Sequence, residues 1–597
     1  MSVARTIPST QTPDVVTYSI LVDGEALPST IPVRSMQINR EINKIPFTRI
    51  RIADGDPSTE SFPISDETYF IPGKEIEIQL GYRSDNTTVF KGIITGHSNK
   101  ITSGNSEIII ECKDKAVKLT VGKKSKHFEN ITDSDIAEQI IDTYSLEKDI
   151  ESTSTQHKEI IQFNTTDWDF MIGRMDVAGK ICSVVDGKIL IKQPELSASS
   201  VLDVLYGATI LEYDAEIDSR IQFNEIKAVA WDYASQSLIE QTADEPSGFQ
   251  DIGNLSNADL ADVIGLESYT LIHSGKLIEE AAKAWADSKM MKVRLAKVRG
   301  HVKFQGFPNI TPGNIISLNG VGDRFNGPVF VNAVKQDFTG GDWTTEIKFG
   351  LDQAWYTEQY NPHNLSAQSG LIPSVQGLQI GIVTDLEDPD GEHRVKVKLP
   401  VVNNDEEGIW MRIATLDAGN TRGTFFRPEI DDEVIVGFIF NDANHPVILG
   451  MLNSSALPPA ITASNDNHEK GYISRDGIKM IFNDDEKSYK LETPGGKKIT
   501  ISDNDSKVQI EDENGNMIKF ESSGVTVESA TSLKIKAATD ITIEAVNITL
   551  SPSSQFAVSA GGSEMKAGPG TAEIKSASVK IEGSGMTEVK GGIVKIN

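Results

Sequence analysis

The chain has 597 residues, too many for a single hydrophobic core, so we expect it to divide into several domains. Its formal net charge is −29. That charge excludes a sequence-independent nucleic-acid binder, which needs a basic face, and a protein that docks on an anionic membrane surface.

The cysteines and the apolar runs indicate where the protein folds. Cys112 and Cys182 cannot build a disulfide framework and lie beside apolar runs, so we expect two buried thiols. No run of about 18 apolar residues could span a bilayer, and residues 1–16 lack the apolar core of a signal peptide. We therefore expect assembly in the cytoplasm, and export by a route other than a cleaved signal.

Residues 1–360 combine strand and helix patterns. Short segments in which apolar and polar residues alternate predict half-buried strands. These segments are 16–24, 35–42, 48–55, 74–82, 88–97, 106–114, 299–308, 314–320, 328–338 and 344–352. Between them a helical period marks 131–144, 165–180 and 274–291. The region is predicted to be an α+β assembly with more than one lobe.

The ends of these helices carry capping signals. Thr132 precedes the first helix and Ser274 the third, and each is expected to accept a hydrogen bond from the first turn. Gly179 follows the second helix and is expected to end it.

A polar segment rich in proline, glycine and serine, 361–377, is predicted to be a linker. Residues 378–455 then form a compact all-β unit. Val395, Val397 and Leu399 face one way, and the lysines between them face the other. Several short strands in about 75 residues predict a small barrel.

A second linker, 456–472, leads to a final β region, 473–597, that has no helical period. From Gly524 onward, apolar pairs recur every eight residues. The side chains of this beat are Val525, Val527, Leu533, Ile535, Ile541 and Ile543, and the next pair, Ile548 and Leu550, follows after seven residues. A fixed short period without caps indicates a repeat architecture.

One copy of this repeat has too little apolar bulk to fold alone. Two aliphatic side chains contribute about 4 kcal/mol per repeat, whereas ordering eight residues costs about 8–16 kcal/mol. Unpaired strand edges would also run along its whole length. Three identical chains would share one apolar axis and pair every edge. We therefore predict an obligate homotrimer with an intertwined, triple-stranded, parallel β-helix, and keep a single-chain β-solenoid as the alternative.

Residues 381–452 carry an ordered series of motifs. Its best-defined members are Asp388, Pro389, Gly391, Arg394, Trp410, Glu433, Pro446 and Gly450. The series resembles the OB-fold domain of VgrG proteins, the spikes of type VI secretion and related contractile injection systems. The chain departs from the usual family pattern in two places. Asp431 stands where glycine is usual, and Asn441-Asp442 replaces a common Gly-Asp.

The segments 166–191 and 306–338 resemble, more weakly, the hub half of the same family and the baseplate hub of tailed phages. This resemblance implies a mainly β protein with an α+β hub, an OB-fold barrel and a β-helix spike. It also implies a hexameric tube protein at the hub face, baseplate proteins, and a target membrane met only during injection. A tip or cargo protein of the PAAR type (proline-alanine-alanine-arginine repeat) would bind the far end, at Gly591, Gly592, Ile593, Val594, Ile596 and Asn597. Export would occur by contraction or on a released particle.

No catalytic, metal or cofactor motif stands out. The gap between barrel and rod is about 15–20 residues, too short for the lysozyme domain that phage spikes can carry. The acidic clusters are expected to solvate loops. The nine histidines show no His-x-His or HxxxH spacing, and His445 is expected to be structural.

The predicted function is therefore a non-enzymatic, trimeric hub and membrane-puncturing spike that joins an inner tube to a tip or cargo protein. Two alternatives remain open, a trimeric adhesin or tail fibre, and a baseplate-associated cell-wall hydrolase.

Overall fold

The computed structural model describes residues 15–232, 237–273, 277–360, 375, 377–400, 402 and 405–596. The chain divides into two units, Met1–Pro458 and Pro459–Asn597, and each is described by itself. Their boundary falls within the segment predicted as the second linker. The segment predicted as the first linker lies almost wholly outside the described residues.

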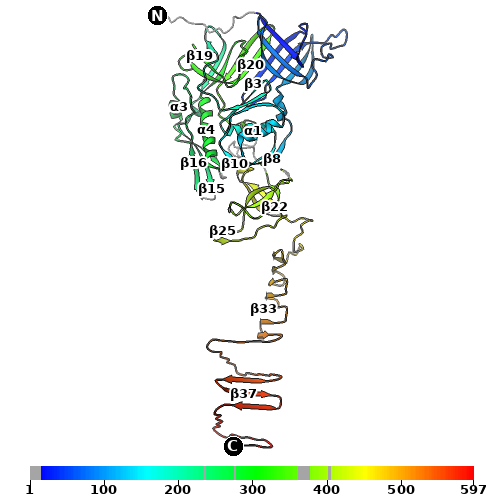
Figure 1. Ribbon diagram of the computed structural model, residues 1–597, viewed down its shortest axis with the longest axis vertical. Coiled ribbons are helices and arrows are strands. Elements are labelled where there is room, and N and C mark those ends of the chain that lie inside the picture. Colours follow the sequence, from blue (N-terminus) through cyan, green and yellow to red (C-terminus); the bar gives the residue numbers. More distant parts are fainter. Residues whose placement is uncertain are drawn as a thin grey trace. The chain divides into compact units, whose positions relative to one another are not determined.

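One long, mainly antiparallel sheet organises the hub. Within the described residues it contains β1 (Val16–Val22), β2 (Glu25–Ala26), β3 (Val33–Glu41), β4 (Phe47–Ala53), β5 (Glu75–Tyr82), β6 (Asp85–Thr102), β7 (Asn105–Lys113), β13 (Asp203–Leu205), β14 (Ile210–Ile217), β18 (Val298–Gln305), β19 (Ile315–Asn319), β20 (Gly327–Thr339) and β21 (Asp342–Phe349). Antiparallel pairing of β3 with β20 joins its N-terminal and C-terminal strands, which lie side by side in Figure 1. Distant parts of the hub sequence thus share one sheet.

The alternating pattern explains what this sheet buries. Met36, Ile38, Ile50 and Ile52 point into one apolar cluster, and the polar residues between them face away. A second cluster surrounds β18 to β21 and includes Val302 and Phe349. Both cysteines are fully buried, and burial raises the pKa of each thiol, as expected for structural cysteines.

Three smaller sheets complete the hub. β8 (Lys124–Thr132) pairs with β10 (Gln156–Thr165); β9 (Glu147–Ile150), β11 (Ile181–Val185) and β12 (Lys188–Lys192) form the second; β15 (Ile226–Asp232), β16 (Ser237–Thr242) and β17 (Tyr269–His273) form the third. Helices pack on these sheets. The helices are α1 (Asp133–Asp142), α2 (Asp167–Val177), α3 (Asn257–Ile264), α4 (Glu279–Leu295) and α5 (Tyr356–Tyr360), with 3-10 turns at η1 (Lys115–Thr120) and η2 (Ser219–Ile221).

The helix ends agree with the sequence in two cases and differ in the third. Thr132 accepts a hydrogen bond from the Asp135 amide at 3.2 Å, and Gly179 ends the α2 region at a φ of 73°. The predicted cap at Ser274 is wrong, and that residue lies outside the described part of the chain. Helix α4 begins later, with Ile278 at the N-cap and no side-chain cap. Glu279 in its first turn complements the helix dipole instead.

The region predicted as a compact all-β unit, 378–455, contains a closed five-stranded barrel. Its strands are β22 (Gln379–Asp385), β23 (Val395–Lys398), β24 (Ile409–Ile413), β27 (Glu433–Phe438) and β28 (Pro446–Met451); outside it lie the hairpin β25 (Ala418–Gly419) and β26 (Arg422–Gly423) and the turn η4 (Ile439–Asn441). Val395, Val397 and Leu399 point into its core, as their alternation predicts. Ile161 of the hub strand β10 joins that core. The barrel is therefore packed directly against the hub.

The unit Pro459–Asn597 is an antiparallel meander. Its first sheet contains β29 (Glu469–Ile473), β30 (Lys479–Asn483), β31 (Ser488–Glu492), β32 (Lys498–Ser502), β33 (Lys507–Glu511), β34 (Met517–Glu521) and β35 (Gly524–Glu528); its second contains β36 (Phe556–Ala560), β37 (Ser563–Gly568) and β38 (Thr571–Lys575) (Figure 1). Within each sheet, each strand pairs with the next along the chain. Between Glu528 and Phe556 the chain forms no strand in this structure. The mainly β fold class, with an α+β hub and an OB-like barrel, is confirmed.

Candidate functional site

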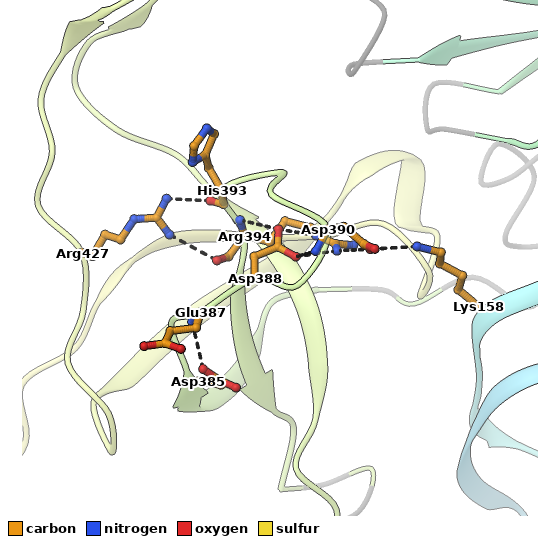
Figure 2. Close-up of polar contacts among 8 residues, drawn as sticks. All are labelled: Lys158, Asp385, Glu387, Asp388, Asp390, His393, Arg394 and Arg427. Carbon is orange, nitrogen blue, oxygen red and sulfur yellow. Dashed lines mark hydrogen bonds and ion pairs between the residues drawn. The ribbon is translucent and has the colours of Figure 1, made fainter.

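The loop between β22 and β23 holds the first group of predicted motif residues (Figure 2). Asp388 accepts hydrogen bonds from Arg394 Nε at 2.9 Å and from Arg394 Nη2 at 2.8 Å. Gly391 closes the turn at a φ of 69°, and its amide donates to the Asp388 carbonyl at 3.1 Å. Pro389 lies exposed at the loop tip. The Asp-Pro-x-Gly spacing thus builds a turn that places Arg394 beside Asp388.

Electrostatics then tie this loop to the hub. The Arg394 hydrogen bonds hold the pKa of Asp388 far below its usual range, so the pair stays ionised. Arg394 also reaches Asp390 at 2.7 Å, and Asp390 pairs with Lys158 of the hub strand β10 at 2.8 Å. In Figure 2 these side chains form one line from the barrel loop to the hub. Arg427 braces the same loop by donating to the His393 carbonyl at 2.7 Å.

The remaining motif residues are structural parts of the barrel. Trp410 of β24 lies 6.0 Å from the Arg394 guanidinium, measured to the ring centroid. Glu433 begins β27, and its carbonyl accepts from the Leu452 amide at 2.9 Å. Pro446 is buried at the start of β28, and Gly450 pairs with Ile435 on the neighbouring strand. The motif is therefore a folding signature, and Arg394, Trp410 and Pro446 also line the cavity described below.

The two departures from the family pattern both fall on strained backbone. Asp431 has a φ of 71° and Asn441 a φ of 58°, which is the left-handed region that favours glycine. Aspartate and asparagine tolerate this region better than other residues. The chain therefore keeps the turn geometry that glycine would supply.

A cavity of about 530 Å³ lies where hub and barrel meet. On the hub side, Arg174 donates to buried Asp133 at 2.8 Å, and Asp133 also contacts His157 at 2.9 Å. Although burial opposes ionisation, Arg174 and His157 lower the pKa of Asp133 to about 2. Glu159 differs, because burial, reinforced by the nearby Glu129 carboxylate, raises its pKa to about 7. The junction thus places the Asp133 carboxylate, which stays ionised, near the Glu159 carboxyl, which titrates near neutrality.

Three further side chains meet at the same junction. His273, the last residue of β17, contacts Asp442 of the barrel, with Nε2 and Oδ2 2.8 Å apart. His445 Nε2 lies 3.8 Å from the same carboxylate oxygen. Burial lowers the pKa of His445, so its imidazole is neutral at pH 7. His273 lies far from the other two in the sequence, and spacing alone gave no sign of this group.

The tail presents its apolar side chains in two continuous lines, here called the apolar columns. One column contains Met480, Leu491, Ile499, Ile510, Ile518 and Val527; the other contains Phe482, Tyr489, Ile501, Val508, Phe520 and Val525. Within each column, successive residues are direct cross-strand partners. Because strand side chains alternate, all twelve lie on one face of the sheet β30–β35. Lys490, Gln509 and Lys519 are among the residues on the other face.

The described residues of the tail unit do not bury these columns. Within the described part of the tail unit, Pro459 to Ile596, the buried residues are Ser488 and Ser502, and no apolar side chain is buried. The eight aliphatic residues of the predicted beat are between 51% and 69% exposed. The described part of the tail unit therefore has no apolar core of its own.

The predicted beat occupies two settings. Val525 and Val527 end the two apolar columns on β35. Leu533, Ile535, Ile541, Ile543, Ile548 and Leu550 lie beyond the last paired strand of that sheet, in the stretch between Glu528 and Phe556. At the predicted tip, Gly591, Gly592, Ile593, Val594 and Ile596 are exposed, and Asn597 lies outside the described residues. No helix within the described ranges is long and apolar enough to cross a bilayer.

Two family models match this chain, one over the barrel and one over the hub. A family model described as the type VI secretion system/phage-baseplate injector OB domain matches residues 379–452. A second, described as the Alg8 N-terminal domain, matches residues 12–340. The first spans the barrel, and the second spans most of the hub.

Two forms of one solved complex share the fold, and a third structure scores lower. The lidded Francisella PdpA–VgrG complex is 10% identical, with 88% of this chain and 81% of that chain covered and a TM-score of 0.51. The half-lidded form is 10% identical, with 86% and 88% covered and a TM-score of 0.50. The E. coli c3393 protein, a component of the type VI secretion system, is 12% identical, with 72% and 99% covered and a TM-score of 0.43.

The barrel match identifies residues 379–452 as an injector OB domain, and the fold shared with VgrG agrees with the resemblance that the motif series suggested. The Alg8 match covers more than half of the chain. The chain therefore belongs to the family described as the Alg8 N-terminal domain family.

Proposed function

We propose that this chain is the hub and spike of a contractile injection apparatus and works as an obligate homotrimer without enzymatic activity. The OB domain of baseplate injectors and the VgrG fold support the hub and spike role. The hub would meet the hexameric inner tube and the baseplate proteins. The tail would form the rod that enters a target membrane during injection.

The observation that carries the trimer is the exposed pair of apolar columns. Each column continues over β30 to β35 without a polar interruption, and the opposite face is mainly polar. One sheet with one apolar face needs a second layer. Three such sheets arranged around an axis would bury all three faces at once and leave the charged faces in water. The residues from Leu533 to Leu550 would find their strand partners on the other two chains.

The exposed end of the tail supports a tip or cargo partner. Ile593 and Ile596 are more than 80% exposed, and they stand beside Gly591 and Gly592. Small and apolar residues at a blunt end suit a partner that sits on three chains together. PdpA, the protein found with VgrG in the Francisella complex, gives a precedent for a VgrG-bound partner. We propose assembly in the cytoplasm and export by contraction or on a released particle.

Cysteine cross-linking tests the trimer with a matched pair. Val525 and Thr526 are neighbours on β35 and point to opposite faces. In the full-length chain, Val525→Cys should cross-link rapidly between chains under mild oxidation, because three thiols would meet near one axis. Thr526→Cys should remain uncross-linked under the same conditions. Equal cross-linking of the two variants would contradict the shared core.

The role in an apparatus needs a separate test, because an adhesin or tail fibre could also be trimeric. Labelled chains should appear by electron microscopy at one end of a sheathed tube, with loss of injection when the gene is deleted. Label on fibres that radiate from a particle would favour the adhesin or tail fibre. Peptidoglycan cleavage by the purified protein would favour the hydrolase.

A further inference from the structure

We propose that His273, Asp442 and His445 bind a divalent first-row transition-metal ion, for which Zn²⁺ is the best match, and that this ion fastens the barrel to the hub. Two imidazole nitrogens and one carboxylate converge at this point. Imidazole and carboxylate are established protein ligands of zinc.

The distances fit a site that closes by a small movement. The three ligand atoms all lie within 4.8 Å of one another. Zinc–ligand bonds of about 2.0–2.1 Å place the ligand atoms of a tetrahedral ion roughly 3.4 Å apart. Asp442 Oδ2 lies 2.8 Å from His273 Nε2 and 3.8 Å from His445 Nε2, on either side of that value. Shifts of these atoms by roughly an ångström or less would complete the geometry.

A hydrogen bond alone explains only part of the group. His273 and Asp442 are within hydrogen-bond distance, but 3.8 Å is too long for a bond from His445 to the same oxygen. The second imidazole nevertheless points at this carboxylate, and the two ring centroids are 5.1 Å apart. A cation between the three groups accounts for the position of both rings.

The backbone around the ligands is well braced. The Asp442 amide donates to the Ile439 carbonyl at 3.1 Å, and the His445 amide donates to the Asp442 carbonyl at 3.0 Å. The other carboxylate oxygen, Asp442 Oδ1, accepts from the Asn444 amide at 2.8 Å. Oδ2 is thereby left facing the two histidines. Such outer contacts orient metal ligands.

The junction cavity lies beside this group and could supply a fourth ligand. Asp442, Asn444 and His445 all line this cavity of about 530 Å³. Within the described part of the chain, the buried side-chain oxygen of Asn444 has no hydrogen-bond donor. A metal-bound water in the cavity would be such a donor. Three protein ligands and one water are a common coordination set for zinc.

The position of the ligands gives the ion its role. His273 belongs to the hub strand β17, whereas Asp442 and His445 belong to the barrel turn after β27. An ion held by all three would therefore cross-link two parts of the chain that the ion pair from Lys158 to Asp390 also joins. Metal binding would resist separation of barrel and hub under load.

The test uses the full-length chain, freed of metal by chelation and then titrated with Zn²⁺. We expect one tight equivalent per chain, and a visible d–d band of a tetrahedral site when Co²⁺ is added instead. His445→Gln and Asp442→Asn should each weaken Zn²⁺ binding by at least about 100-fold, since each removes a direct ligand. His393→Asn is the control, because this exposed histidine at positive φ lies outside the group and asparagine tolerates its backbone.

Two further results separate the metal from a simple hydrogen bond. Chelation should lower the thermal midpoint of the wild type and of His393→Asn, but not that of His445→Gln. X-ray absorption at the zinc edge of the wild type should count two imidazoles, a readout that needs no variant. Absence of stoichiometric Zn²⁺ binding by the wild type, or undiminished binding by His445→Gln, would overturn the proposal.

Discussion

Replacing a single isoleucine of the apolar columns can show whether the tail has a core shared between chains or folds as a single chain. Ile510 lies near the middle of its column, between Ile499 and Ile518. Ile481 is the matched control, because it is also an isoleucine of the same sheet but lies on the opposite face, between the column residues Met480 and Phe482. The perturbation is Ile510→Ala against Ile481→Ala in the full-length chain.

The structure sets the expected magnitudes. Ile510 is 47% exposed in one chain, and Ile481 is less exposed. Burying an isoleucine completely stabilises by about 1.5–3 kcal/mol, so a lone chain loses only about 1 kcal/mol at Ile510 and at least as much at Ile481. In a shared core, each Ile510→Ala costs about 2–5 kcal/mol, and three copies change together, which gives about 6–15 kcal/mol per trimer.

Denaturant-induced dissociation, followed at fixed chain concentration by sedimentation and by circular dichroism, measures the difference. We expect a large drop in the midpoint for Ile510→Ala and a small one for Ile481→Ala. If the tail folds as a single chain, Ile481→Ala should instead lower the midpoint at least as much as Ile510→Ala. Equal midpoints, or a larger loss for Ile481→Ala, would refute the shared core.

Three other substitutions probe the barrel and its junction with the hub. Burial, reinforced by Glu129, raises the pKa of Glu159 from 4.5 to about 7. As the pH rises through this interval the unfolded chain releases the proton first, so the free energy of unfolding falls and the loss is complete above pH 7. Relative to the wild type, the free energy of unfolding of Glu159→Gln should therefore rise little at pH 4.5 and by up to about 3 kcal/mol at pH 8. The difference between the two thermal midpoints should grow with pH, and a constant difference would contradict the pKa shift. Asp388→Asn removes the less exposed of the two carboxylates that pair with Arg394 and should destabilise the barrel by about 1–3 kcal/mol, in a thermal melt monitored at tryptophan; an unchanged melt would show that the Asp388–Arg394 pair carries no stability. Asp431→Gly should be neutral or stabilise by up to about 1 kcal/mol because φ is already 71°, and a loss of stability would mean that the aspartate side chain supports the turn.

The barrel was predictable because its signals are local. Asp388, Gly391 and Arg394 lie within seven residues, so the turn that joins them follows from the motif itself. The alternation at Val395 and Val397 likewise identifies the core face of β23 without any knowledge of its neighbours. The same locality explains why Thr132 was found as a helix cap.

The tail was only partly predictable, because hairpins hide its period. Leu491, Ile499 and Ile510 are successive members of one column, yet they lie 8 and then 11 residues apart. Antiparallel turns alternate short and long steps in this way, so no single beat appears before Gly524. The nearly constant period of seven or eight residues after that point made only the later residues conspicuous.

The junction group was not predictable from spacing. His273 meets Asp442 only because β17 and the turn after β27 are brought together by the packing of hub against barrel. No periodicity or short motif encodes that contact. Ser274, predicted to cap the third helix, lies outside the described residues, and helix α4 begins after Ile278 and packs on β15 and β16.

The central claim is that three copies of this chain share one core, and the mass of the full-length protein in solution tests it most directly. Sedimentation equilibrium should give about 195 kDa, three times the chain mass of 65.1 kDa, and the value should persist as the protein is diluted. A stable species of 65.1 kDa, or one of twice that mass, would contradict the account.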